Sequence, residues 1–145
     1  MHTNRLILII DDDIDDIEVF CEAVIDVDHS AECCAANDGY EALNMILNEL
    51  KTLPSYIFLD LNVPKMDGLE CLSILRAESK LQSVPIIIYT SSSAPNDMYE
   101  SKHLGANYFL RKTSDYKTLC DEIALIMKTD WNQMLVESKL TSNFL

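Results

Sequence analysis

The sequence predicts an α/β fold in which a doubly wound, five-stranded parallel sheet carries five helices. Short apolar runs, typical of strands buried on both faces, alternate five times with segments whose apolar residues recur at helical spacing. The length of 145 residues also suits one domain, since domains usually hold roughly 100–200 residues. Right-handed crossovers between parallel strands would place helices on both faces of this sheet.

Three of the predicted β-α units lie in the first half of the chain. Their strands fall at residues 6–10, 31–36 and 56–59, and turn residues break the chain at 37–39 and 54–55. A loop with Pro64 and Gly68 precedes the third helix. The three helices are indicated by apolar residues three or four positions apart, and these are Ile14, Ile17, Cys21, Val24, Ala42, Leu43, Ile46, Leu47, Leu50, Leu69, Leu72 and Leu75.

Two further units complete the pattern. Strands are predicted at residues 86–89 and 108–110, a weaker helix at 95–103 that ends before Gly105, and a fifth helix that ends near residue 128. We therefore expect one domain over residues 1–128 and a C-terminal extension over 129–145. In that extension Trp131, Met134 and Leu135 share one helical face, so a short helix that packs on the domain is expected before a frayed end.

The composition excludes several classes of function. There are 24 Asp and Glu residues against 11 Lys and Arg, a formal net charge of −13. This balance argues against nucleic-acid binding and against adhesion to an anionic membrane, and it suits a protein that binds cations or a partner protein. The early apolar run at residues 6–10 is too short for a membrane span or a signal peptide. A cytoplasmic location is the resulting prediction.

The five cysteines form no Cys-x-x-Cys pair, and their number is odd. In a reducing compartment we expect them to be free and to pack as small hydrophobic residues. A metal site made of His29, Cys33 and Cys34 is the alternative. It is disfavoured because adjacent cysteines on a strand point to opposite faces.

Polar side chains follow four of the predicted strands, at the point where each strand ends. Asp11 and Asp12 follow the first strand, Asp60 the third, Thr90 the fourth and Lys112 the fifth. Because ligands of doubly wound folds bind beyond the carboxyl ends of the strands, these side chains should converge. Clustered carboxylates repel one another, and Mg²⁺ is the simplest compensation. Lysine and threonine would then suit a phosphoryl group, for which an aspartate is a competent acceptor.

Other aspartates in the acidic segment have simpler explanations. Asp13 suits the N-cap of the first helix, whereas Asp15 and Asp16 suit a solvated first turn that the helix dipole favours.

At this point the sequence resembles the receiver domain of two-component response regulators. The resemblance covers roughly residues 4–128 and rests on Leu8-Ile-Ile-Asp-Asp12, Phe58-Leu-Asp-Leu-Asn62-Val-Pro64-Lys-Met-Asp-Gly68, Pro85-Ile-Ile-Ile-Tyr-Thr90-Ser91 and Gly105 to Lys112. It implies a flavodoxin-like receiver with strand order 2-1-3-4-5. It also implies a phosphoprotein that relays signals rather than an enzyme.

The resemblance assigns a role to each site residue. Asp60 is implied as the phosphoacceptor, with Thr90 as the switch hydroxyl, Phe109 as the switch aromatic residue and Lys112 as the phosphate-pairing lysine. The implied Mg²⁺ is held by Asp11, Asp12, Asp60 and the backbone carbonyl of Asn62. The implied partners are a histidine kinase or phosphotransfer protein and an unknown downstream protein. A homodimer, through the fourth helix with the fifth strand and helix or through the tail, is a further expectation.

One position departs from the family pattern, because Thr113 stands where most receivers have a cis proline. The resemblance favours a cis bond before Thr113 and the base rate favours a trans bond. The Lys-Thr pair, the acidic start and Trp131 also resemble stand-alone regulators of phytochrome-type kinases.

Two other functions use similar residues. A haloacid-dehalogenase-type phosphatase also combines an aspartate nucleophile, a hydroxyl, a lysine and an acid pair around Mg²⁺. Its motifs run in the reverse chain order, and it needs an aspartate where this chain has Asn62. A degenerate receiver that serves only for docking is the other alternative, but all the expected site residues are present here.

Overall fold

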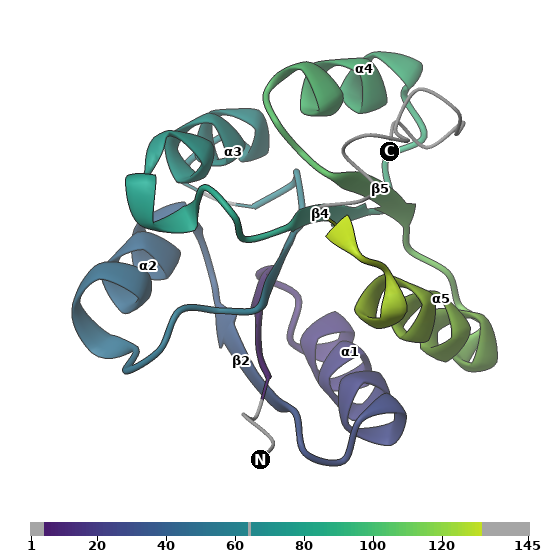
Figure 1. Cartoon of the computed structure of the whole chain (residues 1–145). Helices are drawn as coiled ribbons and strands as arrows, with labels where there is room; N and C mark the ends of the chain where they lie inside the picture. The colour runs from purple at the N-terminus through teal and green to yellow at the C-terminus, as the bar shows by residue number, and fades with distance from the viewer. Residues whose placement is uncertain (1–4, 64, 132–145) are drawn as a thin grey trace.

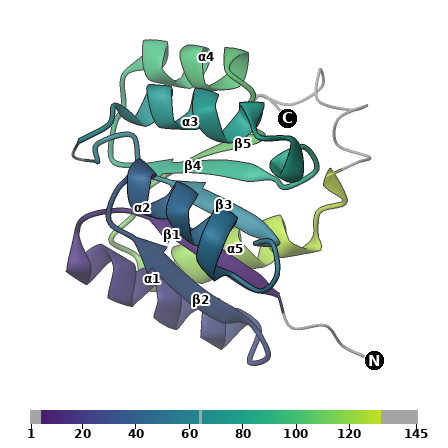
Figure 2. The same ribbon diagram turned by 90° about the vertical axis from the view of Figure 1, so that its left-hand side faces the viewer.

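The computed structural model of the chain describes residues 5–63 and 65–131. Its five strands form one parallel sheet in the order β2-β1-β3-β4-β5, which confirms the predicted fold class. The strands are β1 (Leu6–Ile10), β2 (Glu32–Ala36), β3 (Tyr56–Leu59), β4 (Ile86–Thr90) and β5 (Tyr108–Arg111). The strands β1 and β3 pair with each other inside the sheet, so their carboxyl ends are neighbours (Figure 2).

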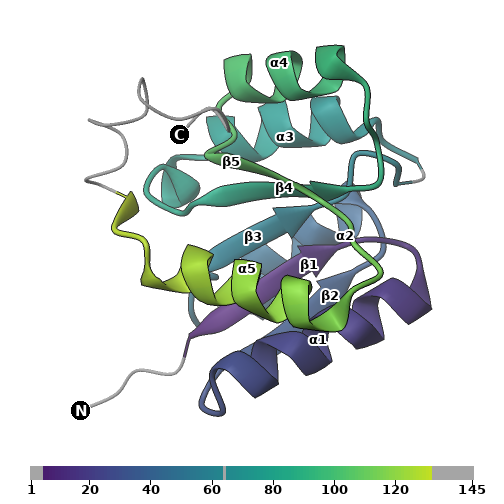
Figure 3. The same cartoon turned by 90° about the vertical axis from the view of Figure 1, so that its right-hand side faces the viewer.

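Helices cover both faces of the sheet (Figures 1 and 2). On one face lie α1 (Ile14–Val27) and α5 (Tyr116–Lys128), whose side-by-side packing is visible in Figure 3. On the other face lie α2 (Gly39–Asn44), α3 (Gly68–Ala77) and α4 (Pro95–His103). Alternate residues of each strand face opposite sides. In β1, Ile7 and Ile9 therefore join the core under α1 and α5, whereas Leu8 and Ile10 join the core under α2 and α3.

The second helix differs from the prediction of one helix that continues to residue 50. After α2 the chain continues as a π-helix, η1 (Met45–Glu49), in which the Leu50 amide donates to the Met45 carbonyl at 2.8 Å. This wider turn still keeps Ala42 and Ile46 in the core. A 3₁₀ turn, η2 (Ser79–Leu81), follows α3.

Three aspartates begin helices by accepting a hydrogen bond from the backbone of the first turn. Asp13 caps α1, as predicted, while Asp38 caps α2 and Asp67 caps α3. Beside Asp67, Gly68 lies so near the loop after β3 that a Cβ atom there would be 2.3 Å from the Leu61 Cα. Only glycine allows α3 to begin this close to the end of β3.

The expectation of five free cysteines was wrong for two of them. Cys21 on α1 and Cys33 on β2 form a disulfide, with their Cα atoms 5.6 Å apart. The reason is tertiary, because α1 packs directly on β2 and brings together residues that are 12 positions apart. The cysteines Cys34, Cys71 and Cys120 are free, and burial raises the pKa of the Cys34 thiol to about 11.

The C-terminal part of the described chain packs back on the domain. Trp131 lies edge-on to Tyr108, and its indole Nε1 donates to the Ile126 carbonyl at 3.1 Å. Met134, Leu135 and the expected frayed end lie outside the described residues. Among residues 5–63 and 65–131, no helix is long and apolar enough to cross a membrane.

Candidate functional site

Backbone pairing brings the first two predicted site residues together. Ile10 and Leu59 are register partners in β1 and β3, so the next residue of each strand, Asp11 and Asp60, follows at the same edge of the sheet. The Asp60 amide donates to the Ile10 carbonyl at 3.0 Å, and the Asp11 amide donates to the Ala36 carbonyl at 3.0 Å. Both carboxylates are buried, Asp11 completely.

Lys112, which directly follows the outermost strand β5, extends its side chain to this pair of aspartates. Its Nζ lies 2.8 Å from Asp11 Oδ2, 3.0 Å from Asp60 Oδ2 and 2.7 Å from Asp16 Oδ2. The other oxygens of the two buried carboxylates accept backbone hydrogen bonds, from the Asp13 amide to Asp11 and from the Asn62 amide to Asp60. Backbone donors therefore fix both buried carboxylates, and Lys112 links them.

The electrostatics of the cluster follow from its burial. Burial raises the pKa of the Asp11 carboxyl, and the hydrogen bond from Lys112 only partly offsets that effect. For Lys112, burial alone would lower the pKa of the ammonium, but the hydrogen bonds to Asp11, Asp16 and Asp60 together raise it above its usual value. The lysine is thus charged at neutral pH and supplies the positive charge that the carboxylates need.

An aromatic layer supports the lysine from below. Its Nζ lies 5.5 Å from the centre of the Tyr89 ring, a cation–π contact. That ring packs against Phe20 at 5.4 Å and Phe58 at 6.5 Å between centroids. Burial raises the pKa of Tyr89 to about 12, so the ring is neutral under the ammonium. The three rings come from α1, β4 and β3, and the contact with Tyr89 joins them to the lysine of the site.

Thr90 ends β4, and Phe109 lies within β5. Thr90 is fully buried, and its carbonyl accepts from the Lys112 amide at 2.9 Å, which ties the two site residues through the backbone. Its hydroxyl oxygen accepts from the Ser92 amide at 3.4 Å. Phe109 is also buried, in the core under α2, α3 and α4. The peptide bond between Lys112 and Thr113 is trans, and Lys112 still reaches the cluster.

The predicted metal ligands are only partly assembled. Asp12 is exposed, while Asp11 and Asp60 are linked through Lys112. Across residues 5–63 and 65–131, no three or more His, Cys, Asp or Glu side chains are arranged to hold a metal ion. This finding also counts against the alternative site at His29, Cys33 and Cys34. The oxygen donors of Asp11 and Asp60 nevertheless suit a hard divalent cation by their chemistry.

Sequence reasoning missed one member of the cluster. Asp16 was expected on a solvated first turn with Asp15, but its carboxylate forms the shortest of the three lysine contacts and is 40% exposed. The available signal was that Asp16 lies in the first turn of α1, directly after the strand end that carries Asp11. How far the Lys112 side chain extends toward that turn could not be read from the order of the residues.

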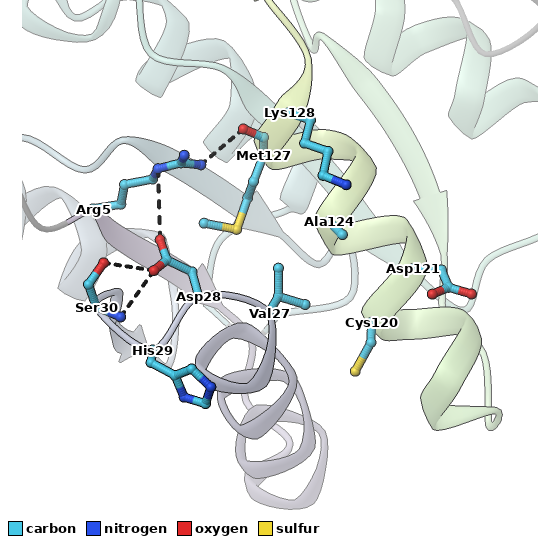
Figure 4. A pocket seen from close by; sticks show the side chains of 10 residues that line it. All are labelled: Arg5, Val27, Asp28, His29, Ser30, Cys120, Asp121, Ala124, Met127 and Lys128. Carbon is cyan, nitrogen blue, oxygen red and sulfur yellow. Dashed lines mark hydrogen bonds and ion pairs between the residues drawn. The ribbon is translucent and has the colours of Figure 1, made fainter. Parts of the chain in front are cut away.

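A cavity of about 820 Å³ lies at the opposite edge of the sheet, between the ends of α1 and α5 (Figure 4). Arg5 closes one side of it by donating to the Met127 carbonyl at 2.9 Å and by pairing with Asp28 at 3.9 Å. Val27, Ala124 and Met127 give it an apolar lining. It is remote from the carboxylate cluster, because it lies at the amino ends of the strands.

A doubly wound sheet that gathers carboxylates, a hydroxyl and an ammonium at its carboxyl edge is typical of receiver domains. The chain belongs to the response regulator receiver domain family, whose model matches residues 7–124. This assignment confirms the resemblance. Response regulators of this family act in two-component signalling, so the chain is a signalling domain of that kind.

Individual relatives agree with this assignment. Response regulator Rcp1 of Synechocystis sp. is 30% identical over 121 residues, which cover 79% of this chain and 81% of that protein. The phosphorylated cyanobacterial phytochrome response regulator RcpA has a similar structure, with a TM-score of 0.78 and 26% identity over 87% of this chain and 93% of that one. The Mn²⁺-bound form of Rcp1 gives a TM-score of 0.73 with 27% identity, over 84% and 91%.

Proposed function

We propose that Asp60 accepts a phosphoryl group from a histidine kinase or phosphotransfer protein and that the domain passes the signal on by protein–protein contact. The observation that carries this proposal is the placement of Asp60. It ends a central strand, is buried, and has the Lys112 Nζ at 3.0 Å and the Asn62 amide at 3.0 Å from its two oxygens. The similarity to phytochrome response regulators supports a kinase of that type.

A divalent cation, for which we propose Mg²⁺, would be held by Asp11, Asp12, Asp60 and the backbone carbonyl of Asn62. The Mn²⁺-bound form of the relative Rcp1 supports a metal of this class. When bound, such an ion neutralises charge that develops on the phosphoryl oxygens. Among the described residues, Lys112 supplies the positive charge that contacts both buried carboxylates, and a bound ion would add a second positive charge beside them.

The chemical step is a nucleophilic substitution at phosphorus. A carboxylate oxygen of Asp60 forms the new P–O bond, and the bond from phosphorus to the donor's leaving group breaks with its electron pair. Lys112 then pairs with a phosphoryl oxygen, and the Thr90 hydroxyl donates to another. Phe109, which is already buried on the neighbouring strand β5, would shift further into the space that Thr90 leaves and change the surface of α4 and β5 that a partner recognises.

Intact mass spectrometry after incubation with acetyl phosphate and Mg²⁺ tests the proposal. The wild-type chain should gain one phosphoryl group, and Asp60→Asn should gain none because an amide is a poor nucleophile. Asp38→Asn is the matched control: Asp38 is also buried, and asparagine caps a helix as well as aspartate does. Phosphorylation of Asp60→Asn would identify Asp11 or Asp12 as the acceptor instead. Turnover of p-nitrophenyl phosphate would favour the phosphatase alternative.

Three broader expectations belong to the same proposal. Residues 1–128 act as the receiver with 129–145 as an extension, and the protein works in the cytoplasm without nucleic acid or membrane.

A homodimer through α4, β5 and α5 would cover Tyr99 and Leu125, which are 67% and 59% exposed. Sedimentation of the wild type against a Tyr99→Ser, Leu125→Ser variant tests the dimer. Monomers in both at about 100 μM, well above a micromolar dissociation constant, would contradict it.

A further inference from the structure

Asp16 has no task in the proposed phosphoryl transfer, yet it makes the closest contact with Lys112. The distance from Lys112 Nζ to Asp16 Oδ2 is 2.7 Å, against 2.8 Å to Asp11 and 3.0 Å to Asp60. The lysine side chain is 14% exposed and that of Asp16 is 40% exposed, so the contact lies at the mouth of the site. Asp16 is thus the most exposed of the three carboxylates that hold the ammonium.

The hydrogen-bonding capacity of lysine makes this third contact informative. An ammonium has three N–H donors, and in this structure each donor has a carboxylate acceptor. In the proposed function, Asp60 becomes an acyl phosphate, and Asp11 would hold a cation. Asp16 is the one acceptor whose carboxylate keeps its charge and its freedom from other ligands throughout the reaction.

We infer that Asp16 is a positioning residue, which anchors the Lys112 ammonium so that it stays directed at the phosphoryl group while its contacts with Asp11 and Asp60 change. This inference rests on the proposed function of Asp60. The lysine can keep one donor on Asp16 and turn the others to phosphoryl oxygens, so the anchor does not compete with the phosphoryl group. Without Asp16, the four-carbon stem would leave the ammonium free to turn toward water.

The backbone of the same residue has a separate role, which allows a clean test. The Asp16 amide donates to the Asp13 side chain at 3.1 Å and so completes the cap of α1. Replacing the Asp16 side chain by alanine leaves that amide in place. Asp15 is the matched control, because it is exposed, lies in the same helical turn and carries the same charge, but has no contact with Lys112.

The first measurement is the rate of phosphorylation of the full chain by acetyl phosphate with Mg²⁺. We expect Asp16→Ala to be slower than wild type by about two- to fivefold, the range that a partly exposed ion pair can supply. Asp15→Ala should match wild type, and Asp16→Glu should recover at least half of the lost rate. Equal rates for Asp16→Ala and Asp15→Ala would overturn the inference while leaving the function of Asp60 intact.

A double-mutant cycle separates positioning from a general structural effect. If Asp16 acts through Lys112, adding Asp16→Ala to a Lys112→Ala chain should change the phosphorylation rate by less than about 1.5-fold. Multiplicative losses in the double variant would show that Asp16 acts independently of the lysine, which would overturn the inference.

A readout that needs no phosphorylation completes the test. In the wild-type chain, three charged acceptors should slow exchange of the Lys112 ammonium protons enough for a ¹H–¹⁵N signal of Nζ at neutral pH. The signal should persist in Asp15→Ala and disappear in Asp16→Ala. Persistence in Asp16→Ala would contradict the anchor, and this result would stand even if the wild-type chain accepted no phosphoryl group.

Discussion

Lys112 and Arg76 are two partly buried cations at opposite ends of the sheet, and their partners differ in kind. Lys112 binds three carboxylates, from the ends of β1 and β3 and from α1. Arg76 binds only neutral oxygens: its Nε donates to the Gly105 carbonyl at 3.0 Å, Nη1 to the carbonyls of Leu81 and Val84, and Nη2 to Asn107 Oδ1 at 2.7 Å. Burial lowers the pKa of the Arg76 guanidinium, whereas the carboxylates raise that of Lys112.

The difference indicates which end of the molecule is built to change. A planar guanidinium with several donors fits fixed carbonyls, and Arg76 uses it to hold the end of α3 against the turn before β5. A flexible ammonium among carboxylates can exchange one partner for another at little cost. The Lys112 contacts at the carboxyl ends of the strands can therefore change, whereas the Arg76 contacts at the amino ends are permanent.

The largest expected effect is on the permanent contacts. Arg76→Ala should lower the free energy of unfolding by about 3 kcal/mol, because it removes the side-chain donors to the Gly105 and Val84 carbonyls. The Leu81 carbonyl and Asn107 Oδ1 each lose one donor and keep a backbone amide. Urea unfolding measures this change, and Lys80→Ala, which removes an exposed cation from the following turn, is the control. If Mg²⁺ restored the free energy of unfolding of Arg76→Ala to the wild-type value, the contacts at the two ends of the sheet would not differ in kind.

The disulfide between Cys21 and Cys33 lies between the two ends and should affect neither cation directly. Its reduction should lower the free energy of unfolding by roughly 2 to 3 kcal/mol, as for a closed loop of about this length. Cys21→Ser, Cys33→Ser should match the reduced wild type in urea unfolding. The double variant should be phosphorylated at the same rate as the wild-type chain. A large loss of rate would show that the disulfide supports the site.

Lys112→Met should lower the free energy of unfolding by about 2 kcal/mol without metal, since it leaves the buried Asp11 and Asp60 facing each other unpaired. The decisive comparison with Arg76→Ala is the response to Mg²⁺. Thermal unfolding should show a larger Mg²⁺-induced stabilisation of Lys112→Met than of wild type. A smaller stabilisation would mean that the lysine helps the metal to bind rather than replacing it.

The smallest effect concerns pH. Because burial raises the pKa of Asp11, the folded chain holds this proton more tightly than the unfolded chain. Protonation of Asp11 therefore stabilises the fold fully below the unfolded pKa of about 3.9, and this stabilisation is lost as the pH rises through the pKa of Asp11 in the folded chain. Mg²⁺ binds the ionised form, so at about ten times its Kd it should stabilise the wild type by about 1.4 kcal/mol at neutral pH.

Thermal unfolding with and without Mg²⁺ at pH 7.5 and at mildly acidic pH checks this expectation. The gain should shrink in acid for wild type and for Arg76→Lys alike, since that change lies at the other end of the sheet. An equal gain at both pH values would argue against a carboxylate site at Asp11.

The sequence was sufficient to predict the sheet and most of the site. Four of the five strands lead into a polar site residue, and the parallel sheet brings Asp11, Asp60, Thr90 and Lys112 to one edge. What it could not predict depends on distances between elements. The Asp16 contact with Lys112 depends on how far the lysine side chain extends over Tyr89, and the disulfide depends on the packing of α1 against β2.

The three partners of Lys112 lie 101, 96 and 52 residues before it in the chain. Contacts this distant form only after the loops between them have closed, which delays them relative to local structure during folding. Until β5 docks at the edge of the sheet, β1 and β3 hold their acidic residues without the cation that balances them. Assembly of the acceptor is thus tied to the arrival of β5, and a chain emerging from the ribosome becomes competent to receive a signal only when its last strand is in place.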